Sequence, residues 1–114
     1  NVSFGGGSVT GNLRFDEQSV SSKVNGKEVN TGLIKFGNII GDDCRLGIQS
    51  GTSPGVKIGS GSFIGSKVLV EEDVPEKSFL RMRNGTVPIL ENKADAPQPE
   101  ARESFRKAVE DRNK

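Results

Sequence analysis

The chain has 114 residues, no Trp, Tyr or His, and a formal net charge of +1. This length fits one domain or a piece of one, and the balanced charge argues against a nucleic-acid partner. No apolar stretch is long enough to span a membrane, so we expect a soluble, cytoplasmic chain without a membrane partner.

Two blocks of six residues open the chain, FGGGSV from Phe4 and TGNLRF from Thr10. They have the spacing of a longer repeat further along the chain. After Phe15 this register of six is lost until about Asn38. The interruption indicates an insertion at about residues 16–37.

The insertion carries the signal of a β-hairpin. Asn25-Gly26 is a dipeptide typical of a type I′ turn, and valines flank it at Val20, Val24 and Val29. We therefore expect a hairpin that projects from the repeat region.

From Ile40 the chain divides into six blocks, IGDDCR, LGIQSG, TSPGVK, IGSGSF, IGSKVL and VEEDVP. The first position is aliphatic in five of them, with Thr52 as the exception, and the second is Gly in four. The fifth position is small or β-branched throughout: Cys44, Ser50, Val56, Ser62, Val68 and Val74.

A repeat of six has a geometric cause. Alternate side chains of an extended segment share a face, so the fifth position of one block and the first of the next both point inward. Three short strands with bends between them close one coil, and coils stack by parallel pairing. This predicts a mainly β fold, a left-handed parallel β-helix of hexapeptide repeats, formed by Phe4–Phe15 and Asn38–Pro75. The alternative is a sandwich of short antiparallel strands.

This fold assigns the core. We expect Cys44 to be a buried thiol without a catalytic role, since no activating partner is evident. The inward aliphatic positions are Ile40, Leu46, Ile58, Ile64 and Val70.

Downstream, Pro75 is expected to end the repeats, and Phe79–Ile89 to form an irregular or extended exit. A polar linker, Glu91–Pro99, leads to an amphipathic helix, which we expect to dock on its own coil or on a neighbouring subunit. The predicted division is a β-helix domain at 1–90 and a linker with a C-terminal helix at 91–114. The apolar face of the helix comprises Ala101, Phe105, Ala108 and Val109.

Three segments carry a family resemblance: VSFGGGSVTGNLRF, KFGNIIGDDCRLG and VKIGSGSFIGSKVLVEEDVPE. They resemble the C-terminal hexapeptide domain of the bifunctional sugar-1-phosphate nucleotidylyltransferase and glucosamine-1-phosphate acetyltransferase family, in its archaeal form. The resemblance implies acetyl transfer from acetyl-CoA to an amino-sugar 1-phosphate in UDP-N-acetylglucosamine synthesis. It also implies a homotrimer, and an N-terminal nucleotidylyltransferase domain missing from this chain, the one place where Mg²⁺ is expected.

The resemblance also implies site residues. Asn12 would face the acetyl group and the amino sugar, and Lys35 would contact the sugar phosphate. Ile48 and Ser66 would lie along the pantetheine arm, and Arg83 near the 3′-phosphate of coenzyme A. The residues themselves leave open that Asn12 only supports a bend and that Lys35 and Arg83 are ordinary surface charges.

Two residues depart from the family pattern. Ser3 stands where an Asn is usual, and Leu13 where bacterial members have a Tyr. The family's base is a His, and this chain has none. We therefore assign no catalytic residue and no metal ligand here, and expect the base upstream, with the chain inactive alone. The lack of His also excludes a trimeric zinc carbonic anhydrase. The alternative function is a non-catalytic assembly or regulatory domain.

Overall fold

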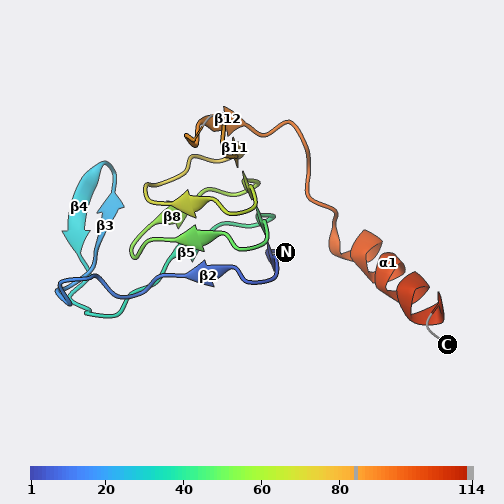
Figure 1. The fold of residues 1–114 in the computed structure, drawn as a ribbon, viewed down its shortest axis with the longest axis horizontal. Helices are drawn as coiled ribbons and strands as arrows, with labels where there is room; N and C mark the ends of the chain where they lie inside the picture. The colour runs from blue at the N-terminus through green and yellow to red at the C-terminus, as the bar shows by residue number, and fades with distance from the viewer. Residues whose placement is uncertain (84, 113–114) are drawn as a thin grey trace.

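The computed structural model describes residues 1–83 and 85–112, which are mostly short strands in parallel sheets with one C-terminal helix (Figure 1). Asn84, in the predicted exit segment, and residues 113–114, in the predicted helical segment, lie outside this part. The elements are β1 (Ser3–Phe4), β2 (Val9–Thr10), β3 (Ser21–Val24), β4 (Lys27–Asn30), β5 (Ile39–Ile40), β6 (Arg45–Leu46), β7 (Gly51–Thr52), β8 (Lys57–Ile58), β9 (Phe63–Ile64), β10 (Leu69–Val70), β11 (Ser78–Leu80), β12 (Ile89–Glu91) and α1 (Pro99–Arg112).

The parallel strands pair at a constant interval. β5 pairs with β8, β6 with β9 and β7 with β10, and in each pair the partners are eighteen residues apart, as in Arg45 and Phe63. Eighteen residues are three blocks of six, so each strand lies beside the equivalent strand three blocks later. This pairing is compatible with a β-helix and contradicts the antiparallel sandwich.

The two blocks at the start of the chain join the same stack. Phe4 in β1 pairs with Leu46 in β6, and Thr10 in β2 pairs with Thr52 in β7. Here the partners are forty-two residues apart because the insertion lies between them. The lost register therefore reflects an inserted segment within the fold rather than an end of the repeat.

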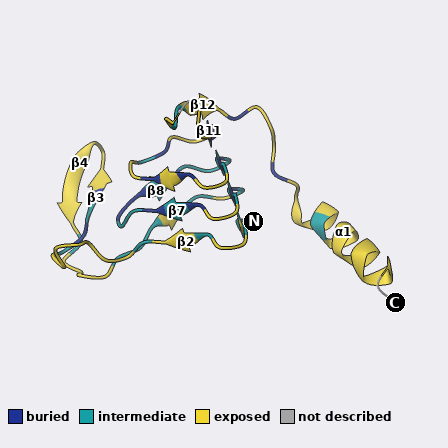
Figure 2. Ribbon diagram, in the orientation of Figure 1, coloured by how far each residue is buried: buried dark blue, intermediate teal, exposed yellow. Residues whose placement is uncertain are grey.

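The core follows the predicted positions with one correction. Leu46, Ile58, Ile64 and Val70 are at most 4% exposed, whereas Ile40 is only half-buried, packed against the core from its edge. Ile40 pairs with Ile58 above it, and β5 has no strand on its other side. The small fifth positions are all buried, and the Cys44 thiol donates to the Gly59 carbonyl at 3.3 Å. Figure 2 shows this burial along the stacked coils.

The insertion forms the predicted hairpin. β3 and β4 pair antiparallel around Asn25-Gly26, whose φ angles of 51° and 79° suit a type I′ turn. The hairpin packs on the coil at Gly55, which has a φ of 83°. A Cβ there would collide with the Ser21 carbonyl, so this contact requires glycine.

Pro75 does not end the stack, so this prediction is wrong. β11 pairs parallel with β9, Leu80 beside Ile64, only sixteen residues along the chain. Pro75 lies in a bend, where its missing N–H removes no ladder bond, and its carbonyl accepts from the Ser62 and Ser78 hydroxyls. β12 then pairs antiparallel with β11. The exit, predicted to be irregular or extended, is thus partly an extended strand pair.

The linker runs along one corner of the coils. Near its start, the Asn92 amide donates to the Gly61 carbonyl at 2.6 Å, and Lys77 Nζ lies 2.8 Å from Asp95 Oδ1. Near its end, the Pro97 carbonyl accepts from Arg45 Nη2 at 3.2 Å. The linker therefore connects the last coil back to the first, and we call residues 92–98 the strap.

The helix forms as predicted but does not dock on its own coil. α1 has no buried residue, and the Phe105 side chain is 71% exposed. Arg102 Nη1 donates to Asn1 Oδ1 at 3.1 Å, which fixes the first turn while the rest points away from the coils (Figure 1). Docking on a neighbouring subunit stays a prediction. Among the residues described, no helix is long and apolar enough to cross a membrane.

The inward register makes a stability prediction. Ile58 is 2% exposed and Ile39, on the adjacent paired strand, is 54% exposed. Ile58→Ala should lower the free energy of unfolding by about 2–5 kcal/mol, because it removes buried methyl groups and leaves a cavity. Ile39→Ala should change it by less than about 1 kcal/mol. Urea unfolding measures both, and equal effects would contradict the register.

Candidate functional site

Two corners of the coil stack carry the predicted site residues. The first corner, which we call the pantetheine corner, follows β6, β9 and β11. Ile48 and Ser66 lie in neighbouring coils there, since Lys67 N donates to the Ile48 carbonyl at 3.0 Å. Both side chains are exposed. The structure therefore places these two residues in one column.

Glycines bring the backbones of this corner close together. A Cβ on Gly47 would lie 2.6 Å from Ser66 N, so the coils stack without side chains between them. Gly65 N donates to the Leu80 carbonyl at 2.6 Å, and Arg81 lies directly over Gly65. Arg83 follows two residues later with an exposed side chain. The corner therefore presents bare backbone beside an arginine-containing turn, an arrangement that can accept an extended chain ending in phosphate.

The second corner, which we call the insertion corner, carries Asn12 and Lys35. Phe36 N donates to the Asn12 carbonyl at 3.0 Å, and Leu13 and Lys35 form an antiparallel bridge. Although the two residues are separated by the hairpin, the structure brings their segments side by side. Both side chains are exposed. An amide and an ammonium group there can bind a hydroxyl or carbonyl and a phosphate.

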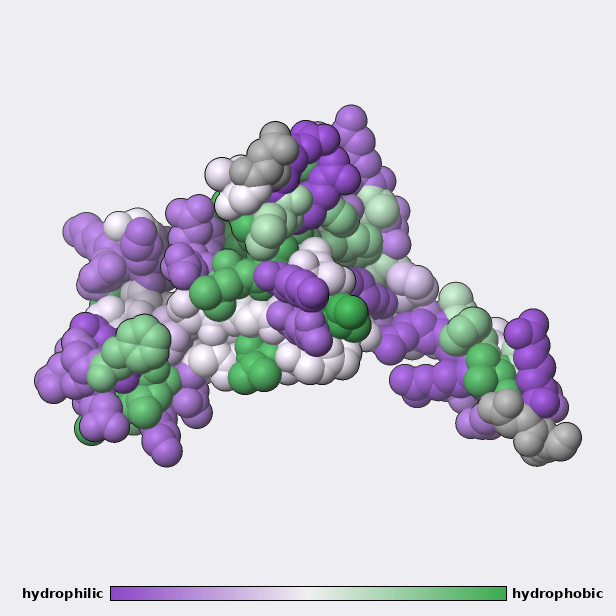
Figure 3. Space-filling view, in the orientation of Figure 1, coloured by the Kyte–Doolittle hydropathy of each residue, from purple (hydrophilic) through white to green (hydrophobic). Residues whose placement is uncertain are grey.

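The two corners do not meet within one chain. Ile48 precedes β7, whereas Asn12 follows β2 and lies beside the bend that follows β7. The two corners therefore lie at opposite ends of the β10-β7-β2 sheet. Val9 and Leu69 on this sheet are 67% and 54% exposed, on either side of Gly51. Figure 3 shows separate hydrophobic areas over the coils, the insertion and the helix.

A hollow beside Asn12 was not predicted from the sequence. It has a volume of about 490 Å³ and is lined by residues 13–16 with Ser53 and Pro54. Phe15 is fully exposed at its rim. The repeat of six covers residues 13–15, Ser53 and Pro54 but does not indicate a hollow, which forms where the segment after β2 lies beside the bend after β7.

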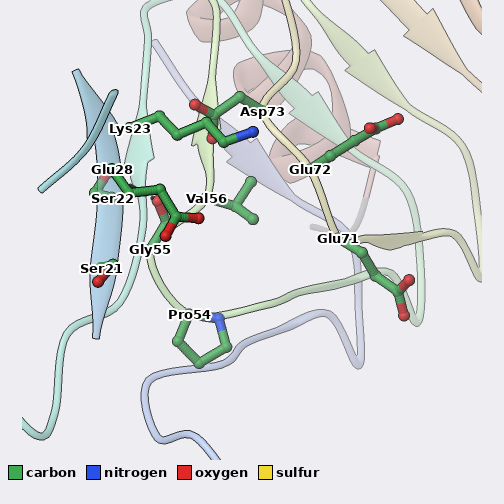
Figure 4. Close-up of a pocket in the computed structure, with 10 residues that line it drawn as sticks. All are labelled: Ser21, Ser22, Lys23, Glu28, Pro54, Gly55, Val56, Glu71, Glu72 and Asp73. Carbon is green, nitrogen blue, oxygen red and sulfur yellow. Dashed lines mark hydrogen bonds between the residues drawn. The ribbon is translucent and has the colours of Figure 1, made fainter. Parts of the chain in front are cut away.

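A second hollow lies between the hairpin and the coils (Figure 4). It has a volume of about 220 Å³ and is lined by Lys23 and Glu28 of the hairpin and by Glu71, Glu72 and Asp73 of the coil. It contains none of the predicted site residues. In the part of the chain that the structure describes, no group of His, Cys, Asp and Glu side chains is arranged to hold a metal ion.

The turn beside Asn12 is held by a carboxylate. The Gln18 backbone N–H donates to Asp16 at 3.1 Å, and the Arg14 guanidinium donates to it at 2.5 Å. Both hydrogen bonds, the backbone one first, lower the pKa of Asp16 from its ordinary value of 3.8. The stabilisation is present above that ordinary pKa and is lost as the pH falls through the lower folded-state pKa.

These findings define a class of protein: short strands of a hexapeptide repeat paired in parallel sheets, compatible with a β-helix, with exposed polar residues at two corners. The comparison with known proteins supplies the family. No family model matches the chain. It is 42% identical over 87 residues to the bifunctional protein GlmU of Methanococcus maripaludis, covering 76% of this chain and 21% of that protein.

Two further relatives agree. The bifunctional sugar-1-phosphate nucleotidylyltransferase/acetyltransferase of Sulfurisphaera tokodaii is 41% identical over 81 residues, 71% of this chain and 20% of that protein. An uncharacterised Escherichia coli protein named as an acetyltransferase, YaiX, is 37% identical over 70 residues, 61% of this chain and 30% of that protein.

The chain is therefore a homologue of one segment of the bifunctional sugar-1-phosphate nucleotidylyltransferase/acetyltransferase family, with archaeal relatives, and the predicted resemblance is confirmed. It spans about a fifth of the length of the two bifunctional relatives.

The turn at Asp16 makes a prediction about pKa. Arg14→Gln should raise the pKa of Asp16 but leave it below 3.8, because the Gln18 N–H still donates to the carboxylate. A carbon-13 NMR titration of the side-chain carboxyl measures this. Lys23→Gln, which changes an exposed cation on the hairpin, is the control and should leave the value unchanged. A full return to 3.8 in Arg14→Gln would mean that the backbone bond has no effect.

Proposed function

We propose that the chain is the acetyl-transferring part of a nucleotidylyltransferase/acetyltransferase, moving an acetyl group from acetyl-CoA to the amine of an amino-sugar 1-phosphate. The observation that carries this proposal is the identity of 41–42% to two bifunctional enzymes across most of the chain. The column of Ile48 and Ser66, beside glycines that let the backbones stack closely, supports it as a path for pantetheine. We place this chemistry in the cytoplasm.

The architecture belongs to the same proposal. Residues 1–90 would form a left-handed β-helix domain, residues 91–114 a linker with a helix, and a nucleotidylyltransferase domain would precede them in a longer protein. Nucleotide-sugar synthesis would then use both domains in sequence. The pairing interval of eighteen residues supports three hexapeptides per coil.

We assign roles to the exposed polar residues. Lys35 would bind the sugar phosphate as a point charge, and Asn12 would hydrogen-bond the amino sugar and the acetyl carbonyl. Arg83 would bind the 3′-phosphate of coenzyme A. Attack by the amine on the thioester requires loss of a proton, and the 114 residues contain no His. A residue outside them would supply the base, so this chain would bind both substrates without joining them.

A homotrimer would complete the site. In one chain, the insertion corner and the pantetheine corner are separated by the β10-β7-β2 sheet, whose outer face exposes Val9 and Leu69. Packing of coils around a threefold axis would cover such faces and place the insertion corner of one subunit next to the pantetheine corner of another.

An assembly or regulatory role is the second candidate. Two observations favour it: Ser3, in β1, and Leu13, beside Lys35, stand where the family resemblance leads us to expect a sugar-binding Asn and a Tyr. Ligand binding separates the two candidates, since a scaffold has no need of coenzyme A.

The coenzyme A assignment can be tested at Arg83. Hydrogen bonds from Arg to phosphate are worth about 1.5–3 kcal/mol, so Arg83→Ala should weaken acetyl-CoA binding by roughly ten- to a hundredfold in calorimetry. Arg106→Ala, on the exposed helix, is the control and should bind as the unchanged chain does. If the unchanged chain gives no heat and no thermal stabilisation at millimolar acetyl-CoA, the scaffold candidate is favoured.

The assembly can be tested by light scattering. At micromolar concentration the chain should have a mass three times that of its 12.2 kDa monomer. Leu69→Lys should shift the mass toward the monomer, because it places a charge on the sheet face that the trimer would bury. Val24→Lys, at an exposed hydrophobic residue of the hairpin, controls for added charge alone. A monomer for the unchanged chain would contradict the trimer.

A further inference from the structure

Thr52 breaks the aliphatic first-position pattern of the six blocks from Ile40, and its side chain is 3% exposed. Its hydroxyl donates to Asn38 Oδ1 at 2.5 Å. A buried hydroxyl is costly unless it is paired, so the Thr at this position requires the Asn. A buried hydrogen bond, rather than apolar packing, therefore connects β7 to Asn38.

The Asn38 side chain uses its remaining groups at the same corner. Its Nδ2 donates to the Ser53 carbonyl at 2.7 Å and the Val56 carbonyl at 3.2 Å. One amide thus contacts β7, the bend after it, and Val56, which immediately precedes β8. Asn38 is also where the insertion rejoins the repeat, so these bonds fix the point at which the inserted segment ends.

Both segments that carry predicted substrate residues attach to this pair. Gly11 N donates to the Thr52 carbonyl at 2.7 Å, one residue before Asn12. Phe36, which follows Lys35 and comes two residues before Asn38, donates its N–H to the Asn12 carbonyl. The position of Asn12 relative to Lys35 therefore depends on the positions of the backbone segments that contain Thr52 and Asn38.

We propose that Asn38 and Thr52 are positioning residues, which align Asn12 with Lys35 for recognition of an amino-sugar phosphate. This inference rests on the proposed function. Neither residue needs to touch the ligand, because each acts through the backbone of a neighbouring segment. The sugar-phosphate half of the site is then set by this buried pair, and the coenzyme A half, on the other corner, is independent of it.

Thr52→Val tests the proposal, since it keeps the shape and removes the hydroxyl. In calorimetry on the 114-residue chain with glucosamine 1-phosphate as the probe, it should weaken binding by about tenfold, because small misplacements of binding groups are costly. Acetyl-CoA affinity should be unchanged. Thr52→Ser keeps the donor and should restore sugar-phosphate binding.

A matched control separates positioning from general stability. Ser62 is also a buried hydroxyl, bonded to the Pro75 carbonyl at 3.1 Å, on a different part of the coil. Ser62→Ala should lower the melting temperature and leave both affinities unchanged. If Thr52→Val does not fold, Asn38→Ala removes the same bond from a half-buried position and should give the same selective loss.

Two outcomes overturn the proposal in distinguishable ways. If the unchanged chain binds glucosamine 1-phosphate and Thr52→Val or Asn38→Ala binds it equally well, or loses affinity for both ligands together, positioning by this pair is wrong. If the unchanged chain binds neither ligand, the proposed function is wrong, and this inference falls with it.

Discussion

The structure depends on parallel pairing of two-residue strands in equivalent places of successive coils. A strand this short has no stability of its own. Each strand must therefore pair with the equivalent strand of a neighbouring coil, in a register that directs the same side chains inward. The eighteen-residue interval of β6 with β9 and β7 with β10 provides this. From β5 to β10 the constraint keeps the blocks at six residues, and it restricts the inward fifth position to small or β-branched side chains, as at Ser62 and Val68.

One half of the candidate site lies at a departure from the constraint. The insertion interrupts the register between β2 and β5, and the polar pair of Thr52 and Asn38 closes the interruption. On the other corner, glycines at 47 and 65 remove side chains and let the backbones approach. The glycines are regular second positions of their blocks, whereas a coil stack of uniform blocks would lack the insertion. The proposed sugar-phosphate half of the site therefore lies where the repeat is broken, and the proposed coenzyme A half lies where its glycines recur.

The sequence predicted what local periodicity encodes. The column of Leu46, Ile58, Ile64 and Val70 follows from the repeat of six, and the hairpin follows from Asn25-Gly26. It mispredicted features that depend on three-dimensional neighbours. Pro75 was predicted from the sequence to end the repeats, but it occupies a bend that tolerates proline. Ile40 follows the core pattern of the sequence, but its strand has no coil on its other side. Asn38 was missed because its role depends on Thr52, fourteen residues away. The hollow at Phe15 was missed because its two lining segments, 13–16 and 53–54, meet only in the folded chain.

The strap changes how the fold can come apart. In stacked repeats, each coil contacts only its neighbours, so the ends can fray one unit at a time. Residues 92–98 bond to Gly61 and Lys77 in upper coils and, through Arg45 and Asn1, to the lowest ones. Opening of the last coil therefore also disrupts the contacts that the strap makes with the first coil. This closed connection couples the two ends and makes unfolding more cooperative, so amide hydrogens at both ends should exchange with solvent through the same opening event.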